Sequence, residues 1–169
     1  NSLLRNASVT LIHSLVLFFL SFALFLSFVS LELPDSNIFD GHYVIDTFGT
    51  NLKIIALIAA ILVHLGSFKS KQNIKNEIFL IQLFATLGVM ILCSAYNLLT
   101  VYLGLETLTL SMYGIVASNR NSIEATESAM KFFILGAIAS AIFLYGVSIL
   151  YGVTGTLSLD LIKDLILLD

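Results

Sequence analysis

The feature that most limits how this chain can fold is a series of long apolar runs separated by short polar segments. About 20 apolar residues are enough for a helix to cross the hydrocarbon core of a bilayer. Because lipid cannot pair backbone polar groups, a spanning segment has to satisfy them internally as a helix. We predict five transmembrane helices, over residues 7–31, 46–68, 78–96, 98–117 and 122–151.

The composition supports the same class. The 169 residues are 58% hydrophobic and 11% charged, whereas a soluble domain carries about 25% charged residues. We therefore expect an all-α integral membrane protein, organised as a single domain over residues 1–169, with membrane lipids around it. The absence of a basic tract argues against a nucleic-acid partner. The single Cys93 cannot form an internal disulfide and has no metal-ligand spacing around it, so no metal site is expected.

Loop charges predict the orientation of the helices. Basic residues in the loops mark the cytoplasmic or matrix side of a membrane protein. If the five helices alternate in direction, one side receives Arg5, Lys69, Lys71, Lys75 and Arg120. The other side receives mainly acidic residues, namely Glu32, Asp35, Asp40, Asp160 and Asp164, with Lys163. The N-terminus is therefore predicted on the positive side.

Short polar segments indicate how the helices are joined. About two residues separate the third and fourth helices, which predicts a tight helical hairpin around Asn97. Asn121 and Glu124 have the spacing of a capping box at the start of the fifth helix. Residues 157–169 are predicted to form an amphipathic helix that lies in the membrane interface or packs on a partner. Its apolar stripe consists of Leu157, Leu161, Ile162, Leu165 and Leu168.

Glu106 is the candidate functional residue, because it lies eight residues inside the fourth predicted helix. That depth is about 12 Å, where a charge costs about 3 kcal/mol on insertion scales. One interpretation is a neutral glutamic acid that bonds to a neighbouring helix. The other is a proton-relay carboxylate, balanced between desolvation and a nearby cation.

Other polar residues within the helices also have two interpretations. Lys131 is either a relay base between Glu106 and the aqueous face or the partner of Glu127, four residues earlier on the same helix. His13 and His64 are either proton stepping stones or helix–helix hydrogen-bonding groups. Lys53, near a helix end, is interpreted as an interface anchor. Small residues on the fifth helix predict close packing against another helix, and they are Gly136, Ala137, Ala139, Ser140, Ala141 and Gly146.

Two segments resemble one known family. They are YLGLETLTLSMYGIVAS (residues 102–118) and SAMKFFILGAIASAIFLYGVSILYGVTGTLSL (residues 128–159). They are similar to subunit 2, called subunit N in bacteria, of respiratory complex I, the proton-pumping NADH:quinone oxidoreductase. The similarity covers roughly residues 46–159. It is carried by Gly-Leu-Glu at 104–106, by Met130-Lys131 followed by Phe132, and by the YGVTGTLSL that closes the fifth helix.

The resemblance implies an antiporter-like subunit of the proton-translocating membrane arm, with no redox centre or cofactor in this chain. NADH, FMN, iron–sulfur clusters and quinone would be bound by other subunits. Glu106 matches a glutamate that pairs with a lysine on a later family helix, and Lys131 matches a lysine on the family's sixth helix. That later helix and the second inverted repeat are missing here, so we expect a partial subunit completed by a second chain.

Two other functions are left open by the residues. One is a purely structural membrane-arm subunit, which would pack Glu106 in dry apolar surroundings. The other is a cation/proton antiporter subunit. The composition, rich in Ile, Phe, Leu, Ser and Asn, predicts the mitochondrial inner membrane as the location of this multi-pass chain, with a bacterial inner membrane as the alternative.

Overall fold

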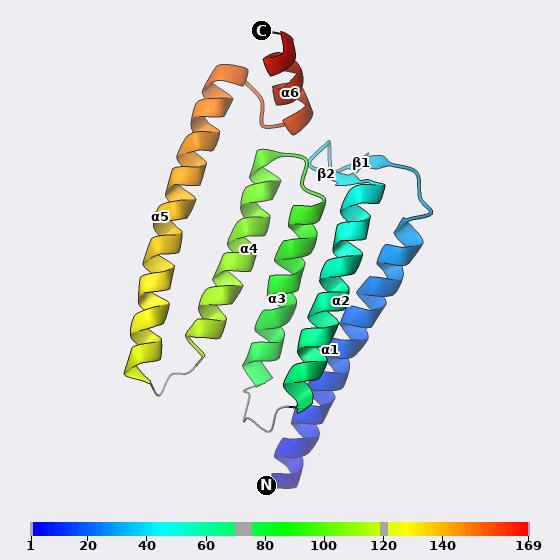
Figure 1. Ribbon diagram of the computed structural model, residues 1–169, viewed down its shortest axis with the longest axis vertical. Helices are drawn as coiled ribbons and strands as arrows, with labels where there is room; N and C mark the ends of the chain where they lie inside the picture. Colours follow the sequence, from blue (N-terminus) through cyan, green and yellow to red (C-terminus); the bar gives the residue numbers. More distant parts are fainter. Residues whose placement is uncertain (1, 70–75, 119–121, 169) are drawn as a thin grey trace.

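The computed structural model describes residues 2–69, 76–118 and 122–168. Within them the chain forms six helices and one small hairpin of two strands (Figure 1). The helices are α1 Ser2–Ser30, α2 Thr47–Lys69, α3 Asn76–Cys93, α4 Leu98–Val116, α5 Ile123–Thr154 and α6 Leu159–Leu168. The strands are β1 Ser36–Ile38 and β2 Tyr43–Ile45.

The predicted membrane class is confirmed. Four segments of the described residues are long and apolar enough to cross a membrane, namely 11–30, 47–67, 98–116 and 123–154. The segment predicted over 78–96 is a shorter apolar helix, α3, which ends at Cys93. The 32 residues of α5 would extend about 48 Å, more than the hydrocarbon thickness, so this helix has to tilt or project beyond it.

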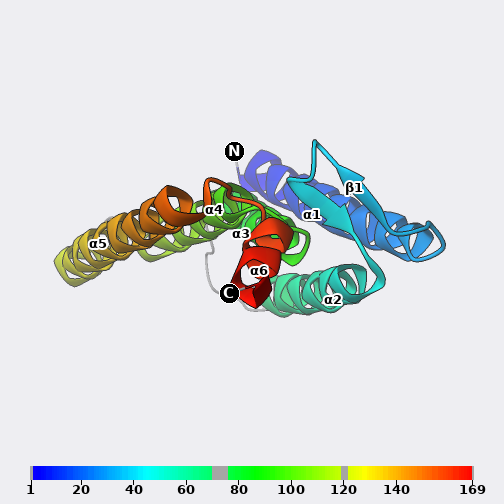
Figure 2. The same ribbon diagram turned by 90° about the horizontal axis from the view of Figure 1, so that it is seen from above.

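Figure 1 shows α1 to α5 side by side with successive helices running in opposite directions, as predicted. Viewed from above, α3, α4 and α5 follow one another in a row, with α5 at its end (Figure 2). The alternating order places the hairpin, the turn after α3 and α6 at the same end of the bundle. Of the basic residues used to predict the orientation, Lys71, Lys75 and Arg120 lie outside the described residues.

The core lies between α1, α2 and α3. Its buried apolar side chains are Val16 and Leu20 from α1, Leu57 from α2 and Phe79 from α3. Most other large apolar side chains are exposed in the isolated chain, and those of α5 are exposed over much of the helix. This distribution is expected of a chain whose outer surface faces lipid or neighbouring helices rather than water.

Asn97 joins α3 to α4, as predicted for the helical hairpin. Its backbone is extended, and its side-chain oxygen accepts a hydrogen bond from the Leu99 N–H at 2.9 Å, which caps α4. The cap of α5 differs from the expectation. Ser122 is the N-cap and accepts from the Ala125 N–H, whereas Asn121 lies outside the described residues.

The hairpin at residues 36–45 was predicted only as an acidic loop. Phe39, Asp40 and Gly41 form its turn with positive φ angles of 54°, 58° and 81°. The hairpin covers the turn after α3, because the Val44 N–H donates to the Ser94 carbonyl at 2.9 Å. On the other side of that turn, the Leu98 N–H donates to the Leu157 carbonyl at 3.0 Å. Three loops therefore form one hydrogen-bonded cap.

Lys53, interpreted as an interface anchor, is covered by the hairpin. Only 8% of its surface is exposed, and its Nζ lies 4.9 Å from the ring centroid of Tyr43 in β2. The hairpin therefore covers this lysine, and the aromatic face stabilises its charge.

The terminal helix α6 has the predicted amphipathic character. Ile162 is buried against the bundle, whereas Leu161 and Leu165 of the expected stripe are exposed. Part of the apolar face is thus available to a membrane interface or a partner, as the sequence predicted.

Candidate functional site

Glu106 lies on the face of α4 that is directed towards α5. Its carboxylate accepts a hydrogen bond from the Ser140 hydroxyl of α5. The phenol of Tyr102, one turn earlier on α4, also interacts with this carboxylate. Glu106 is only partly buried in the isolated chain. These helices alone therefore leave the carboxylate partly exposed, and both interpretations of Glu106 stay open.

The carboxylate lines a groove of about 390 Å³ between α4 and α5. The groove contains one acidic group, three hydroxyls and otherwise apolar side chains. Its lining residues are Tyr102, Glu106, Leu110, Tyr113, Phe133, Ala137, Ser140, Ala141 and Leu144. Among the described side chains, none of the lining groups is a cation. The immediate partners of Glu106 in this chain are thus hydroxyl groups.

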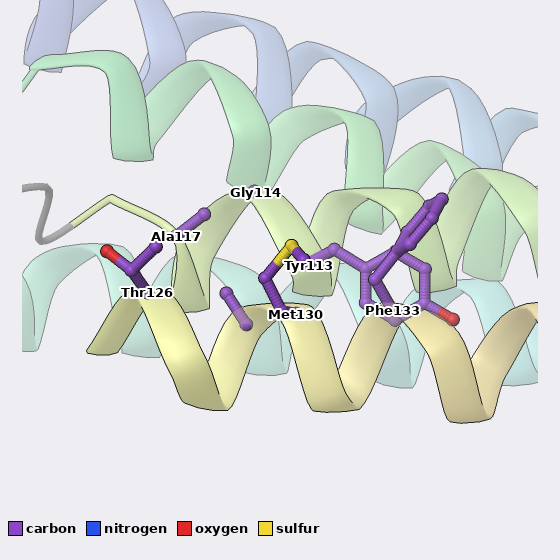
Figure 3. A pocket seen from close by; sticks show the side chains of 7 residues that line it. Tyr113, Gly114, Ala117, Thr126, Met130 and Phe133 are labelled. Carbon is purple, nitrogen blue, oxygen red and sulfur yellow. The ribbon is translucent and has the colours of Figure 1, made fainter. Parts of the chain in front are cut away.

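A second, more apolar groove of about 530 Å³ continues along the same pair of helices. Figure 3 shows Tyr113 on α4 and Met130 and Phe133 on α5 directed into it. Tyr113 and Phe133 line both grooves, so the two hollows adjoin. An apolar lining of this kind suits a lipid chain or an apolar helix face rather than a charged substrate.

Small residues on α5 allow the polar side chains of α4 to approach this helix closely. A Cβ atom built at Gly136 would lie 1.5 Å from the Tyr113 hydroxyl, so any larger residue would require the phenol to move. Ser140 follows one turn later and faces Glu106. The predicted small-residue surface is confirmed at these positions. A Cβ atom built at Gly146 would have no other atom within 4 Å, so Gly146 does not belong to this contact.

Lys131 lies apart from Glu106 in this structure. Its Nζ is 2.5 Å from the Glu127 carboxylate, and the two side chains are 70% and 60% exposed. This is the same-helix pair that the sequence offered as one of two interpretations. Lys131 lines neither groove. A relay through it would require a change of partner.

His13 and His64 form a helix–helix hydrogen bond, which was one of their two interpretations from the sequence, and the sequence did not predict that they bond to each other. Their ring nitrogens Nδ1 and Nε2 are 3.1 Å apart across α1 and α2, deep in the core. Among the described residues, no three His, Cys, Asp or Glu side chains gather in a way that could hold a metal ion.

Comparisons with known proteins match this arrangement to one family. The family model for the transmembrane region of NADH:quinone oxidoreductase and Mrp antiporter subunits matches residues 95–168, which include α4, α5 and α6. NADH-quinone oxidoreductase subunit N of Nitrosomonas europaea is 50% identical over 124 residues, 72% of this chain and 26% of that protein. The chain belongs to the NADH:quinone oxidoreductase/Mrp antiporter family of membrane subunits.

Further relatives agree on this family. Subunit N of Thioalkalivibrio sulfidiphilus is 43% identical over 140 residues, 80% of this chain and 29% of that protein. A chain of respiratory complex I from Thermus thermophilus superposes with a TM-score of 0.75 at 31% identity, covering 89% of this chain and 33% of that chain. An archaeal membrane-bound sulfane sulfur reductase shares the fold, with a TM-score of 0.76 at 22% identity.

The chain spans between a quarter and a third of the length of these family members. The matched region contains Glu106, Lys131 and Ser140. Sequence reasoning assigned Ser140 to packing and did not single out Tyr102. The signal that could have identified Ser140 is a hydroxyl among small apolar residues, at mid-helix depth on the helix that follows Glu106.

Proposed function

We propose that this chain forms part of the proton-translocating membrane arm of an NADH:quinone oxidoreductase, with Glu106 as a proton-binding carboxylate. The supporting observation is the Glu106–Ser140 hydrogen bond between the middles of α4 and α5. An ionisable group at such depth is expensive in lipid and typically marks an ion pathway. The hydroxyl of Ser140 can stabilise the ionised carboxylate and remain in contact after it is protonated, since a hydroxyl both donates and accepts.

The cation that would tune Glu106 is proposed to come from helices outside this chain's bundle. The groove at Glu106 contains hydroxyls and apolar groups but none of the described lysines or arginines. The family members named above are three to four times longer than the segment that each shares with this chain. Their remaining helices, on the same polypeptide or on a second one, would cover the exposed face of α5. A lysine there would lower the proton affinity of Glu106 when it approaches.

Lys131 is proposed as a relay group that exchanges partners. In the observed state it neutralises Glu127 on the exposed surface of α5. Lysine has a long flexible stem, so the ammonium group can leave Glu127 and turn towards the α4–α5 groove when a neighbouring helix supplies charge. A proton would then move between Glu106 and Lys131 through water or a bridging side chain.

The electron-transfer chemistry is proposed to belong to other subunits of the assembly. NADH, FMN, iron–sulfur clusters and quinone would be bound there, and this chain would respond through electrostatic changes at its helices. Its partners would then be other membrane-arm subunits and membrane lipids. The solved structure that is 31% identical is a chain of respiratory complex I, which supports this proposal.

The proposed location is a bacterial-type inner membrane, which the chain crosses several times. The mitochondrial location expected from the composition lacks support, because the subunit N relatives named above are bacterial.

Cation/proton antiport is a second candidate, because the family description names Mrp antiporters beside the oxidoreductases. Glu106 would then exchange a proton for a metal cation. A structural subunit is the third candidate, favoured by the absence of a cation among the described groups that line the groove. Dependence of transport on added Na⁺ distinguishes antiport, and full pumping without the Glu106 carboxylate identifies a structural role.

The test is proton uptake by vesicles that contain the assembled complex, measured per NADH oxidised. We expect Glu106→Gln to lower this ratio, while NADH oxidation by a soluble electron acceptor continues. Glu124→Gln is the matched control, because Glu124 is an exposed glutamate in the first turn of α5. An unchanged ratio in Glu106→Gln would reject the proposed role.

A further inference from the structure

A buried pair of histidines lies in the three-helix core and takes no part in the function proposed above. His13 of α1 and His64 of α2 have relative exposures of 6% and 0%. His13 Nδ1 and His64 Nε2 are 3.1 Å apart, a hydrogen-bonding distance. The ring of Phe79 from α3 packs against both, with centroid distances of 3.9 and 5.1 Å. The pair thus joins α1 and α2, and α3 encloses it.

Few charged groups among the residues with described side chains belong to the helices around this pair. Among the residues whose side chains are described, His13 is the titratable group of α1, and α2 contributes Lys53 besides His64. Lys53 is eleven residues from His64 and faces the hairpin at the far end of the bundle. On α3, Glu77 is exposed, whereas Phe79 faces the histidines.

The number of hydrogens on the four ring nitrogens limits what the pair can bind. Two neutral imidazoles carry two N–H groups, and one of these must occupy the 3.1 Å contact as N–H···N. A third hydrogen can be added at an outer nitrogen without disturbing the contact. A fourth would place N–H groups on both facing nitrogens, which repel each other and break the contact.

An outer nitrogen is open to this change. His64 Nδ1 is buried and has no hydrogen-bond partner in the described structure. A buried polar atom without a partner costs free energy, so a native site of this kind calls for an explanation such as a role in proton binding or an ordered water. The hydrogen count and this unpartnered nitrogen both indicate that an outer nitrogen can take up one further hydrogen.

We propose that the His13–His64 pair is a binding site for a single proton, separate from Glu106. The pair shares an N–H···N hydrogen bond in both of its states, so α1 and α2 stay joined whether the proton is bound or released. Binding adds one hydrogen to the two already present, and release returns it to a water molecule that reaches the outer nitrogen. The site holds at most one positive charge while the helices remain packed.

The test is ¹⁵N nuclear magnetic resonance of the full chain in lipid bilayers, with labelled histidine rings. The chain has three histidines, and His42 is exposed in the hairpin, where it serves as an internal reference. From about pH 9 down to about two units below the ordinary histidine pKa of about 6.5, we expect the pair to take up one proton.

The His42→Gln variant is the matched control and should take up one proton, with the coupling between His13 Nδ1 and His64 Nε2 present at both ends of the titration. Uptake of two protons by the pair with this coupling retained would overturn the proposal, and so would uptake of none. Neither result depends on proton pumping, so failure here is distinguishable from failure of the role of Glu106.

Discussion

The Glu106 carboxylate of α4 is hydrogen-bonded to the Ser140 hydroxyl of α5. This contact places the acid of one membrane helix against the small-residue face of the next. Two small residues of α5, one turn apart, contribute to this arrangement. Gly136 leaves space for the Tyr113 phenol, and Ser140 supplies the donor for Glu106.

Ser140→Ala should lower proton translocation less than Glu106→Gln does, because it removes a hydrogen bond but keeps the carboxylate. The loss of stability should be about 1 kcal/mol, typical of a side-chain hydrogen bond between membrane helices. Proton uptake per NADH and unfolding in detergent measure the two effects. Ser21→Ala is the control, since the Ser21 hydroxyl bonds to Leu17 of its own helix. An effect of Ser140→Ala equal to that of the control would contradict the contact.

Lys131→Gln should reduce proton translocation, whereas Glu127→Gln should leave it nearly unchanged. The Lys131–Glu127 pair is exposed and within one helix, so its coupling energy should be below about 0.5 kcal/mol. A double-mutant cycle on stability measures that energy, and vesicle assays measure translocation. Equal effects of the two substitutions on translocation would mean that the pair acts only as a surface salt bridge.

Gly88→Ala should weaken the packing of α3 against α4. A Cβ at Gly88 would lie 2.7 Å from the Leu108 backbone nitrogen, so the two helices would have to separate. Overpacking of this kind costs about 1–3 kcal/mol. Gly146→Ala is the matched control, because nothing lies within 4 Å of its built Cβ. Thermal unfolding of the two variants should therefore differ, and equal melting temperatures would contradict this close helix approach.

The cap at the acidic end predicts a pH effect. The hydrogen bond to Asp160 raises the pKa of Tyr96, with burial and neighbouring acids adding to it. Because the folded state holds the phenol proton more tightly, this stabilisation is complete below the unfolded pKa of about 10 and is lost as pH rises through the folded value. Asp160→Asn should lower the pKa of Tyr96, and Asp164→Asn should lower it less.

Tyrosinate absorbance, compared with that of Tyr96→Phe, measures both shifts. If Asp160→Asn and Asp164→Asn lower the pKa equally, the hydrogen bond is not the main cause.

The helices were predictable because each apolar run is bounded by polar residues, which lipid excludes. Their rotation about their own axes was not, since runs that are apolar on all faces give no periodic signal. For that reason the sequence offered His13 and His64 as separate residues, and only the packing of α1 on α2 brings them together. Because the rotation of α5 about its axis was not predictable, the sequence indicated only a packing role for Ser140.

The hairpin was missed for a different reason. Its strands have three residues each, too few for an alternating pattern to stand out. The dipeptide Asp40-Gly41 was the available signal, because such a pair favours the positive φ angles of a tight turn. Recognising it would also have suggested that Lys53 is covered, since the hairpin lies over the start of α2.

The most direct test of the central claim is infrared difference spectroscopy of the complex during turnover, which detects the C=O stretch of a carboxylic acid. If Glu106 gains and loses a proton, a band for a protonated carboxyl should appear and disappear with NADH addition, and Glu106→Gln should remove it while Glu124→Gln keeps it. A band pattern that Glu106→Gln leaves unaltered would contradict the account.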